Sequence, residues 1–245
     1  MKKYLVLLWL LLPLPVVVMH FGRGQEWLAR DKAYAFVTKA QIAEGKEDWQ
    51  QASRYYGEAV KCVKTDNREL KLRLDLAQVR TQFRLGEAVA AIDGVDKILD
   101  DPATATMPVE FKRESRELAG RIHYYAGWVM RLEGASRELW MEEAELSRQN
   151  FRLLAEESAA KGEKEYTSKQ QENLESAVQL QRLSLTELMA RPLPKEGQCM
   201  NGKGLTEQMS KRRGQRGKKP GRGDNEDGPP SKGAGMKRFE PGSGS

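Results

Sequence analysis

Apolar and polar side chains alternate with a helical period through most of the chain. Between residues 25 and 191 the apolar positions recur every three to four residues, which places them on one face of an α-helix. This segment is rich in Ala, Leu, Glu, Arg, Lys and Gln and almost free of proline, as helical proteins are. The pattern predicts an all-α domain of about seven helices, arranged as three helical hairpins and a final capping helix. The apolar stripes of these helices cover residues 27–43, 49–63, 72–83, 91–98, 108–132, 136–154 and 168–191.

Short polar side chains that can cap a helix stand at several of the expected boundaries. Asp66 or Asn67 can cap the third helix, and Ser136 can cap the sixth. Ser168 and Gln171 stand three positions apart, which is the spacing of a capping box before the last helix. These residues predict where three of the helices begin.

The N-terminus is the most hydrophobic stretch of the chain. Two lysines precede an unbroken apolar run from Tyr4 to Met19, which is typical of an export signal or a membrane anchor. The 16 residues of this run make about 24 Å of helix at ~1.5 Å per residue. Only Gly22 and Gly24 offer the small residues that cleavage needs, so we expect residues 1–24 to stay as a single-pass anchor. The body then lies outside the cytoplasm, and release after cleavage is the alternative.

The last part of the chain differs sharply in composition. Residues 192–245 hold 12 Lys and Arg against 6 Asp and Glu, together with 12 of the 22 glycines and 6 of the 10 prolines. With so few apolar side chains, this segment predicts a disordered basic tail. Its charge is concentrated in one candidate binding segment, made of Lys211, Arg212, Arg213, Arg216, Lys218, Lys219 and Arg222. Outside the cytoplasm, an anionic lipid, polymer or acidic protein is a better partner for this segment than nucleic acid.

The residue types that carry catalysis are sparse. His123, one of two histidines, is expected to be a structural histidine on a helix, and the acidic pairs 142–143 and 156–157 are expected to face solvent. No nucleotide-binding loop and no cluster of metal ligands occurs in the sequence. Whether Cys62 and Cys199 pair stays open, although two unpaired thiols are favoured. The sequence therefore predicts neither an enzyme nor a cofactor or metal site.

Aromatic side chains are the candidate binding residues of the helical body. Tyr55 and Tyr124 each adjoin an aromatic residue that already belongs to the core stripe of its helix, so they are candidates for an exposed groove. Trp128, another aromatic residue that could line such a groove, is the third candidate. Most other aromatic residues are expected to fill the hairpin cores.

The first predicted hairpin resembles the tetratricopeptide repeat (TPR) family. The six positions that carry this resemblance are Phe36, Ala40, Ala43, Ala52, Tyr56 and Ala59. Lys39 and Glu47 depart from the family pattern, which favours Leu and Gly there. A second, longer unit shares Gly86 and Ala91; Ala91 lies 39 residues after Ala52, against about 34 in the family. The resemblance implies a TPR-like helical-hairpin solenoid that binds a protein partner on its concave face.

Two segments, residues 147–152 and 183–195, are similar to the membrane-associated TPR proteins of bacterial aerotolerance operons. This resemblance implies a scaffold at the bacterial inner membrane, with its body in the periplasm. It also implies partners such as von Willebrand A-domain proteins or membrane proteins linked to MoxR-type ATPases. The sequence thus predicts a non-catalytic, membrane-anchored adaptor. The alternative is a protein that binds an anionic lipid, polymer or nucleic acid through its basic tail.

Overall fold

The computed structural model describes residues 23–63, 67–190 and 204–216, and all regular structure in these ranges is helical. The described part of the chain contains nine α-helices and one short 3-10 helix, η1. In chain order they are α3 (Arg23–Gly45), α4 (Trp49–Cys62), α5 (Arg68–Leu85), α6 (Ala88–Asp100), η1 (Pro102–Thr106), α7 (Val109–Leu132), α8 (Arg137–Ala160), α9 (Lys164–Arg182), α10 (Leu185–Met189) and α11 (Leu205–Arg216).

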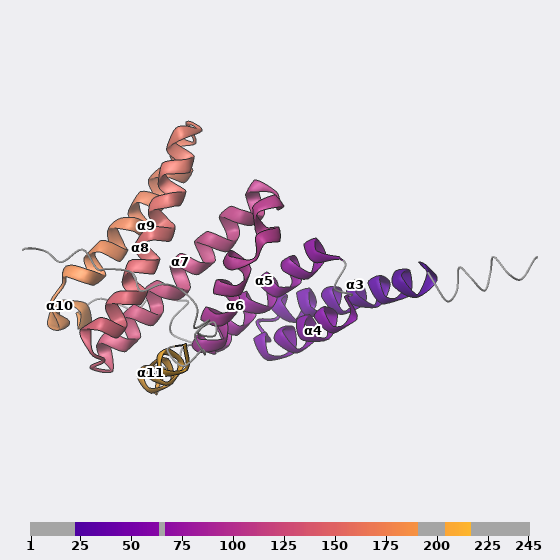
Figure 1. Cartoon of the computed structure of the whole chain (residues 1–245), viewed down its shortest axis with the longest axis horizontal. Coiled ribbons are helices and arrows are strands. Elements are labelled where there is room, and N and C mark those ends of the chain that lie inside the picture. Colours follow the sequence, from indigo (N-terminus) through magenta and orange to yellow (C-terminus); the bar gives the residue numbers. More distant parts are fainter. Residues whose placement is uncertain (1–22, 64–66, 191–203, 217–245) are drawn as a thin grey trace, which may run out of the picture.

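Consecutive helices pack against one another along the molecule, so the fold is helical and repeat-like. α3 packs on α4, α5 on α6, and α7 on α8, and α9 then packs on α8 (Figure 1). The predicted all-α class and the seven expected helices are therefore present. α10 and α11 were not expected as separate helices.

Alanines form the seam of the first hairpin, which consists of α3 and α4. Ala40, Ala52 and Ala59 are completely buried, and each removes the side-chain bulk that would hold the two backbones apart. Asp48 begins α4, because its carboxylate accepts a hydrogen bond from the Gln51 N–H at 3.0 Å. Glu47 has a φ of 56°, the left-handed conformation that explains why a glycine suits this position better.

The second hairpin, α5 and α6, has the ends that its sequence predicts. The Asn67 side chain accepts a hydrogen bond from the Leu70 N–H at 3.2 Å and caps α5. Gly86 ends α5 with a φ of 79°, and its N–H donates to the carbonyls of Gln82 and Phe83. From here a continuous apolar core runs through α5, α6, α7 and α8.

The end of the repeat-like array differs from the prediction. α9 begins at Lys164, so Ser168 and Gln171 lie inside the helix and form no capping box. α9 ends at Arg182, and the Arg131 guanidinium of α7 donates to the carbonyl oxygens of Leu180 and Leu183. Because these carbonyls have a partner outside the helix, the chain can turn here. A capping box does form at α10, between Ser184 and Glu187.

Part of the predicted disordered tail is helical. α11 packs against α6, α7 and α8, and it lies below these helices in Figure 1. Leu205 and Met209 are 4% and 5% exposed and join the main core. Their spacing of four places both on one face of the helix, which supplies the burial that the tail as a whole lacks.

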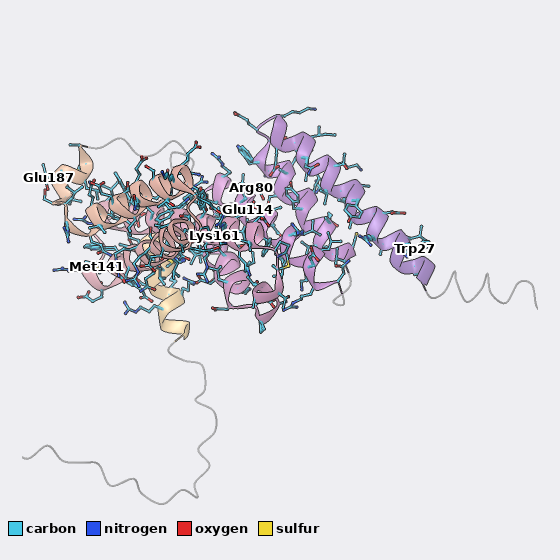
Figure 2. All side chains as sticks on the ribbon, turned by 90° about the horizontal axis from the view of Figure 1, so that it is seen from above. Trp27, Arg80, Glu114, Met141, Lys161 and Glu187 are labelled. Atoms are coloured by element: carbon cyan, nitrogen blue, oxygen red, sulfur yellow. The ribbon has the colours of Figure 1, made fainter. Side chains whose placement is uncertain are left out.

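The described residues do not include positions 1–22 of the predicted anchor, which spans residues 1–24, nor Cys199, Lys218, Lys219 and Arg222. None of the helices in the described ranges has the length and hydrophobicity that a membrane span requires. α3 is nine residues longer than α4, and Trp27 is exposed near its start (Figure 2). The neighbouring Leu28 is exposed as well.

Candidate functional site

A groove lies between α5, α7 and α9, and we name it the α5–α7–α9 groove. It encloses about 390 Å³. Four arginines and three glutamates line it, together with two apolar side chains and one tyrosine. These residues are Arg80, Arg84, Arg113, Arg121, Glu110, Glu114, Glu117, Phe83, Leu118 and Tyr166. The groove is thus a mixed-charge surface with a small basic excess.

Arg80 connects three helices along one wall of the groove. Its guanidinium donates to Glu44 of α3 at 3.2 Å and to Glu114 of α7 at 3.3 Å. Figure 2 shows Arg80 and Glu114 close together. The Arg80 side chain remains 42% exposed, so it is held in place by two carboxylates while solvent still reaches it. A fixed guanidinium can offer donors to an added carboxylate without first becoming ordered.

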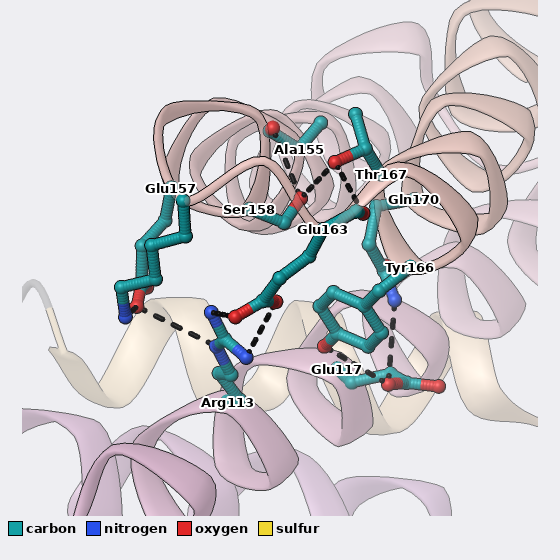
Figure 3. A network of polar contacts seen from close by, with 10 residues as sticks. Arg113, Glu117, Ala155, Glu157, Ser158, Glu163, Tyr166, Thr167 and Gln170 are labelled. Carbon is teal, nitrogen blue, oxygen red and sulfur yellow. Dashed lines mark hydrogen bonds and ion pairs between the residues drawn. The ribbon is translucent and has the colours of Figure 1, made fainter.

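A second network joins α7 to α8 and α9 (Figure 3). Arg113 forms ion pairs with Glu163 at 2.8 Å and Glu157 at 3.5 Å. Glu117 accepts hydrogen bonds from the Tyr166 hydroxyl at 3.3 Å and from Lys169 at 2.7 Å. Partial burial, together with the Glu117 carboxylate, raises the pKa of Tyr166 to about 12, so the phenol stays protonated and can donate.

The floor of the groove is apolar. Phe83 and Leu118 are 1% and 6% exposed and belong to the main core. Because the floor is part of the main core and the walls carry paired charges, the arrangement can hold an extended chain by exchange of ion pairs. The sequence analysis missed this groove. Its charged residues lie beside the apolar stripes of their helices, and charge at such positions usually indicates only a solvent-exposed face.

The predicted aromatic candidates lie elsewhere. Tyr55 is half-buried and stacks on Phe36 in the first hairpin, with 6.5 Å between ring centroids. Tyr124 is half-buried and contacts the rings of Tyr125 and Trp128 edge-on. Trp128 is only 3% exposed, which corrects the prediction that it lines an open groove. None of the three candidates lines the α5–α7–α9 groove.

A buried charge cluster joins α6, α7 and α8. His123 is 1% exposed and lies 3.3 Å from Asp96 and 2.6 Å from Glu143. Glu143 is 4% exposed, so the expectation that residues 142–143 both face solvent is wrong for Glu143. The reason is that a carboxylate can be buried where a histidine on the neighbouring helix neutralises it.

The protonation of this cluster follows from its geometry. Burial by itself lowers the pKa of His123, but hydrogen bonds and charge from Asp96 and Glu143 outweigh burial and raise it to about 9. Burial raises the pKa of Asp96, but His123 and Arg212 outweigh it and lower it to about 2. The histidine is therefore a cation at neutral pH and holds its proton too tightly for a general base. Within the described ranges, no group of side chains could hold a metal ion.

The basic residues of α11 are partly engaged within the molecule. The Arg212 side chain is only 11% exposed and donates to Asp93 at 2.6 Å and to Asp96 at 2.7 Å. Arg212 is thus paired within the fold, which corrects the prediction that it is part of a free basic tail. Lys211 pairs with Glu207 on its own helix, and Arg213 lies 3.7 Å from Glu142. Arg216 ends α11.

The described residues define an all-α protein of helical repeat-like architecture with a polar groove between α5, α7 and α9. Comparisons with protein-family models, with curated proteins and with solved structures found no match for this chain. The functional argument therefore rests on the groove, the buried cluster and the docked helix α11.

Proposed function

We propose that this protein is a non-catalytic, TPR-like scaffold that binds an extended, acidic segment of a partner protein in the α5–α7–α9 groove. The observation that carries the proposal is the groove itself, in which consecutive hairpins present charged side chains over an apolar floor. Arginine binds carboxylates through a planar fork of donors, and the arginines outnumber the glutamates in this groove. An acidic segment is therefore the best electrostatic match.

The TPR-like part of the proposal is supported by the first hairpin. Ala40, Ala52, Tyr56 and Ala59 carry the resemblance to the family, and all four are at most 2% exposed. They occupy the positions where two helices of such a repeat pack closely. Stacked helical hairpins of this kind form an elongated surface suited to holding a peptide.

The proposal includes attachment to a bacterial membrane through the N-terminal apolar run. Trp27 and Leu28, near the start of α3, are 61% and 57% exposed and follow the last residue of that run, Met19, by eight and nine positions. Tryptophan is enriched where a protein meets the lipid headgroups, so these side chains suit a membrane-proximal position. A reporter fused after Ser245 that is active only outside the cytoplasm, with Met1–Gly24 present in the intact mass, tests this part.

Site-specific photocrosslinking tests the groove. Benzoylphenylalanine is placed at Glu110, which is exposed at the groove, and separately at Arg152, which is exposed on α8. In cells that produce the protein, we expect a discrete crosslink from Glu110 only, and mass spectrometry should locate it in an acidic segment of the partner. Equal crosslinking from both positions, or a crosslinked segment without acidic residues, would contradict the proposal.

Two further variants sharpen the test. Arg121→Glu reverses a charge at the groove and should reduce the Glu110 crosslink at least fivefold, while Arg137→Glu, an exposed residue at the start of α8, should leave it unchanged. Removal of residues 217–245 should also leave the crosslink unchanged. If that removal abolishes partner binding instead, the basic tail is the active element, and its partner is then an anionic lipid, polymer or nucleic acid.

A further inference from the structure

A few side chains at regular spacing hold α11 on the surface formed by α6, α7 and α8. Leu205, Met209 and Arg212 occupy the first, fifth and eighth positions of α11, and this spacing puts all three on the same face of the helix. The two apolar side chains enter the main core, and Arg212 reaches Asp93 and Asp96. Other side chains of α11, such as Glu207, Gln208 and Ser210, are exposed.

The start of α11 is held by a side chain from another part of the chain. Glu133, which follows α7, accepts hydrogen bonds from the backbone N–H groups of Gly204 at 3.2 Å, Leu205 at 3.3 Å and Thr206 at 2.7 Å. The first N–H groups of a helix have no partner within it, and a carboxylate also suits the positive end of the helix dipole. Glu133 therefore recognises the beginning of a helix through its backbone, largely independent of its sequence.

We propose that this surface, the α11 site, is a binding site for a short basic amphipathic helix of a partner protein, and that α11 is its releasable intramolecular occupant. The site has three parts: Glu133 binds the helix start, the apolar surface of α6–α8 takes two side chains four apart, and Asp93 with Asp96 binds an arginine three positions later. A helix laid into a groove and read at such spacing is a recurring mode of peptide recognition.

The charges of the site select the class of partner. Asp93, Asp96 and Glu133 bind α11, and Glu142 lies 3.7 Å from Arg213 at its edge. Four carboxylates around one surface repel phosphate, so a lipid headgroup or a nucleic acid would not occupy it. A cationic helix is the complementary ligand.

The small number of anchors makes α11 releasable. Leu205 and Met209 are its two buried apolar side chains in the described range. The ion pair of Arg213 with Glu142 at the edge of the site is about half exposed, so salt weakens it. The advantage of α11 over an added helix is its attachment to the same chain, which raises its effective concentration at the site. A partner helix with a fourth anchor, or at high local concentration, can therefore replace it.

A peptide-binding experiment tests the proposal on the full chain. The probe is a fluorescein-labelled peptide of residues 203–216, and its anisotropy is followed as protein is added. In the variant Leu205→Asp/Met209→Asp the chain's own α11 cannot dock, so we expect the peptide to bind at least tenfold more tightly than to the wild-type chain. The matched control is Gln208→Asp/Ser210→Asp, which adds the same charge on exposed positions and should bind the peptide as weakly as wild type.

The probe itself has a control. A peptide with Arg212→Glu should bind the released variant at least tenfold less tightly, because it meets Asp93 and Asp96 with a like charge. If the released variant binds the normal peptide no better than the wild type, or binds both peptides equally, the proposal is wrong.

Hydrogen exchange of the wild-type chain gives a second test that needs no variant to fold. We expect the α11 amides to exchange at least tenfold faster than those in the middle of α7, and faster again when salt is raised from 0.15 to 1 M. If α11 exchanges as slowly as α7 at both salt concentrations, α11 is a fixed part of the domain and the proposal fails.

Discussion

The first and third hairpins have the same architecture, and completely buried alanines occur in both, but the third also buries an ion pair. In the first, α3 and α4 meet along alanines that are completely buried, such as Ala40 and Ala52. In the third, α7 and α8 bury polar groups between them, including His123 and Glu143, 2.6 Å apart. A seam of small apolar residues lets two helices approach closely. A buried ion pair adds a stricter requirement, because its two side chains meet only when the two helices are aligned at one register. We therefore expect the third hairpin to be less tolerant of change.

The largest loss of stability should come from removing one member of the buried ion pair. Glu143→Ala leaves His123 with Asp96 as its remaining carboxylate in the cluster, and removal of one member of a buried ion pair typically costs about 3–5 kcal/mol. Urea unfolding followed by circular dichroism measures this loss. Glu142→Ala, the exposed neighbour, is the control and should change stability by less than about 0.5 kcal/mol. Equal effects of the two variants would show that the buried pair contributes little.

Glycine-to-alanine changes should have opposite signs in the two hairpins. At Gly120 of α7 an added Cβ would lie 2.7 Å from the Phe151 ring, and overpacking of this kind costs about 1–3 kcal/mol. At Gly57 of α4 the nearest atom is the Gln78 amide nitrogen at 3.6 Å, an ordinary contact. Gly57→Ala should therefore gain up to about 1 kcal/mol from helix propensity. Thermal unfolding of the two variants gives the comparison, and stabilisation by Gly120→Ala would contradict it.

The buried cluster of His123, Asp96 and Glu143 should make the free energy of unfolding depend on pH. The pKa of His123 is about 9 in the fold, above its ordinary value of 6.5, so its contribution is complete below pH 6.5 and is lost as pH rises toward 9. The pKa of Asp96 is about 2, below its ordinary 3.8, so its contribution is present above pH 3.8 and is lost as pH falls toward 2. Unfolding measured from pH 6 to 10 should show the loss in the wild type and a flatter profile in His123→Gln. An identical decline in both would assign it to other groups.

The smallest effect should come from exposed ion pairs. Glu69 pairs with Arg73 on the surface of α5 at 3.0 Å, and both side chains are about half exposed. Such pairs contribute about 0.3–0.5 kcal/mol at most, and salt screens them. Glu69→Gln should shift the midpoint of urea unfolding only slightly, and not at all in 1 M salt. A loss comparable to that of Glu143→Ala would show that the position has a role beyond its ion pair.

The helical framework could be predicted because its signals are local. A stripe such as Leu72, Leu76, Val79 and Phe83 lies within one helix, and all four residues are buried as expected. The burial of Glu143 could not be predicted in this way. Its partner His123 lies 20 positions away on another helix, and nothing in the spacing within either helix indicates that the two meet.

The groove and α11 were missed for different reasons. The residues of the groove come from α5, α7 and α9, and no single helix shows that their charged faces converge. The helix α11 was not predicted, because the composition was taken over residues 192–245 together and glycine and proline are abundant in that range. The stretch from Leu205 to Arg212 has a helical pattern of its own, which a shorter window along the tail would have found.

The long-range contacts of α11 also determine the order in which parts of the molecule can fold during synthesis. The hairpins join neighbouring segments, so each can form soon after it leaves the ribosome. By contrast, Arg212 meets Asp93 across 119 positions, and Gly204 meets Glu133 across 71. Closing such long loops is slow compared with forming a hairpin. The surface of α6, α7 and α8 therefore stays uncovered until α11 has been made, and a chaperone or a partner helix can reach it first.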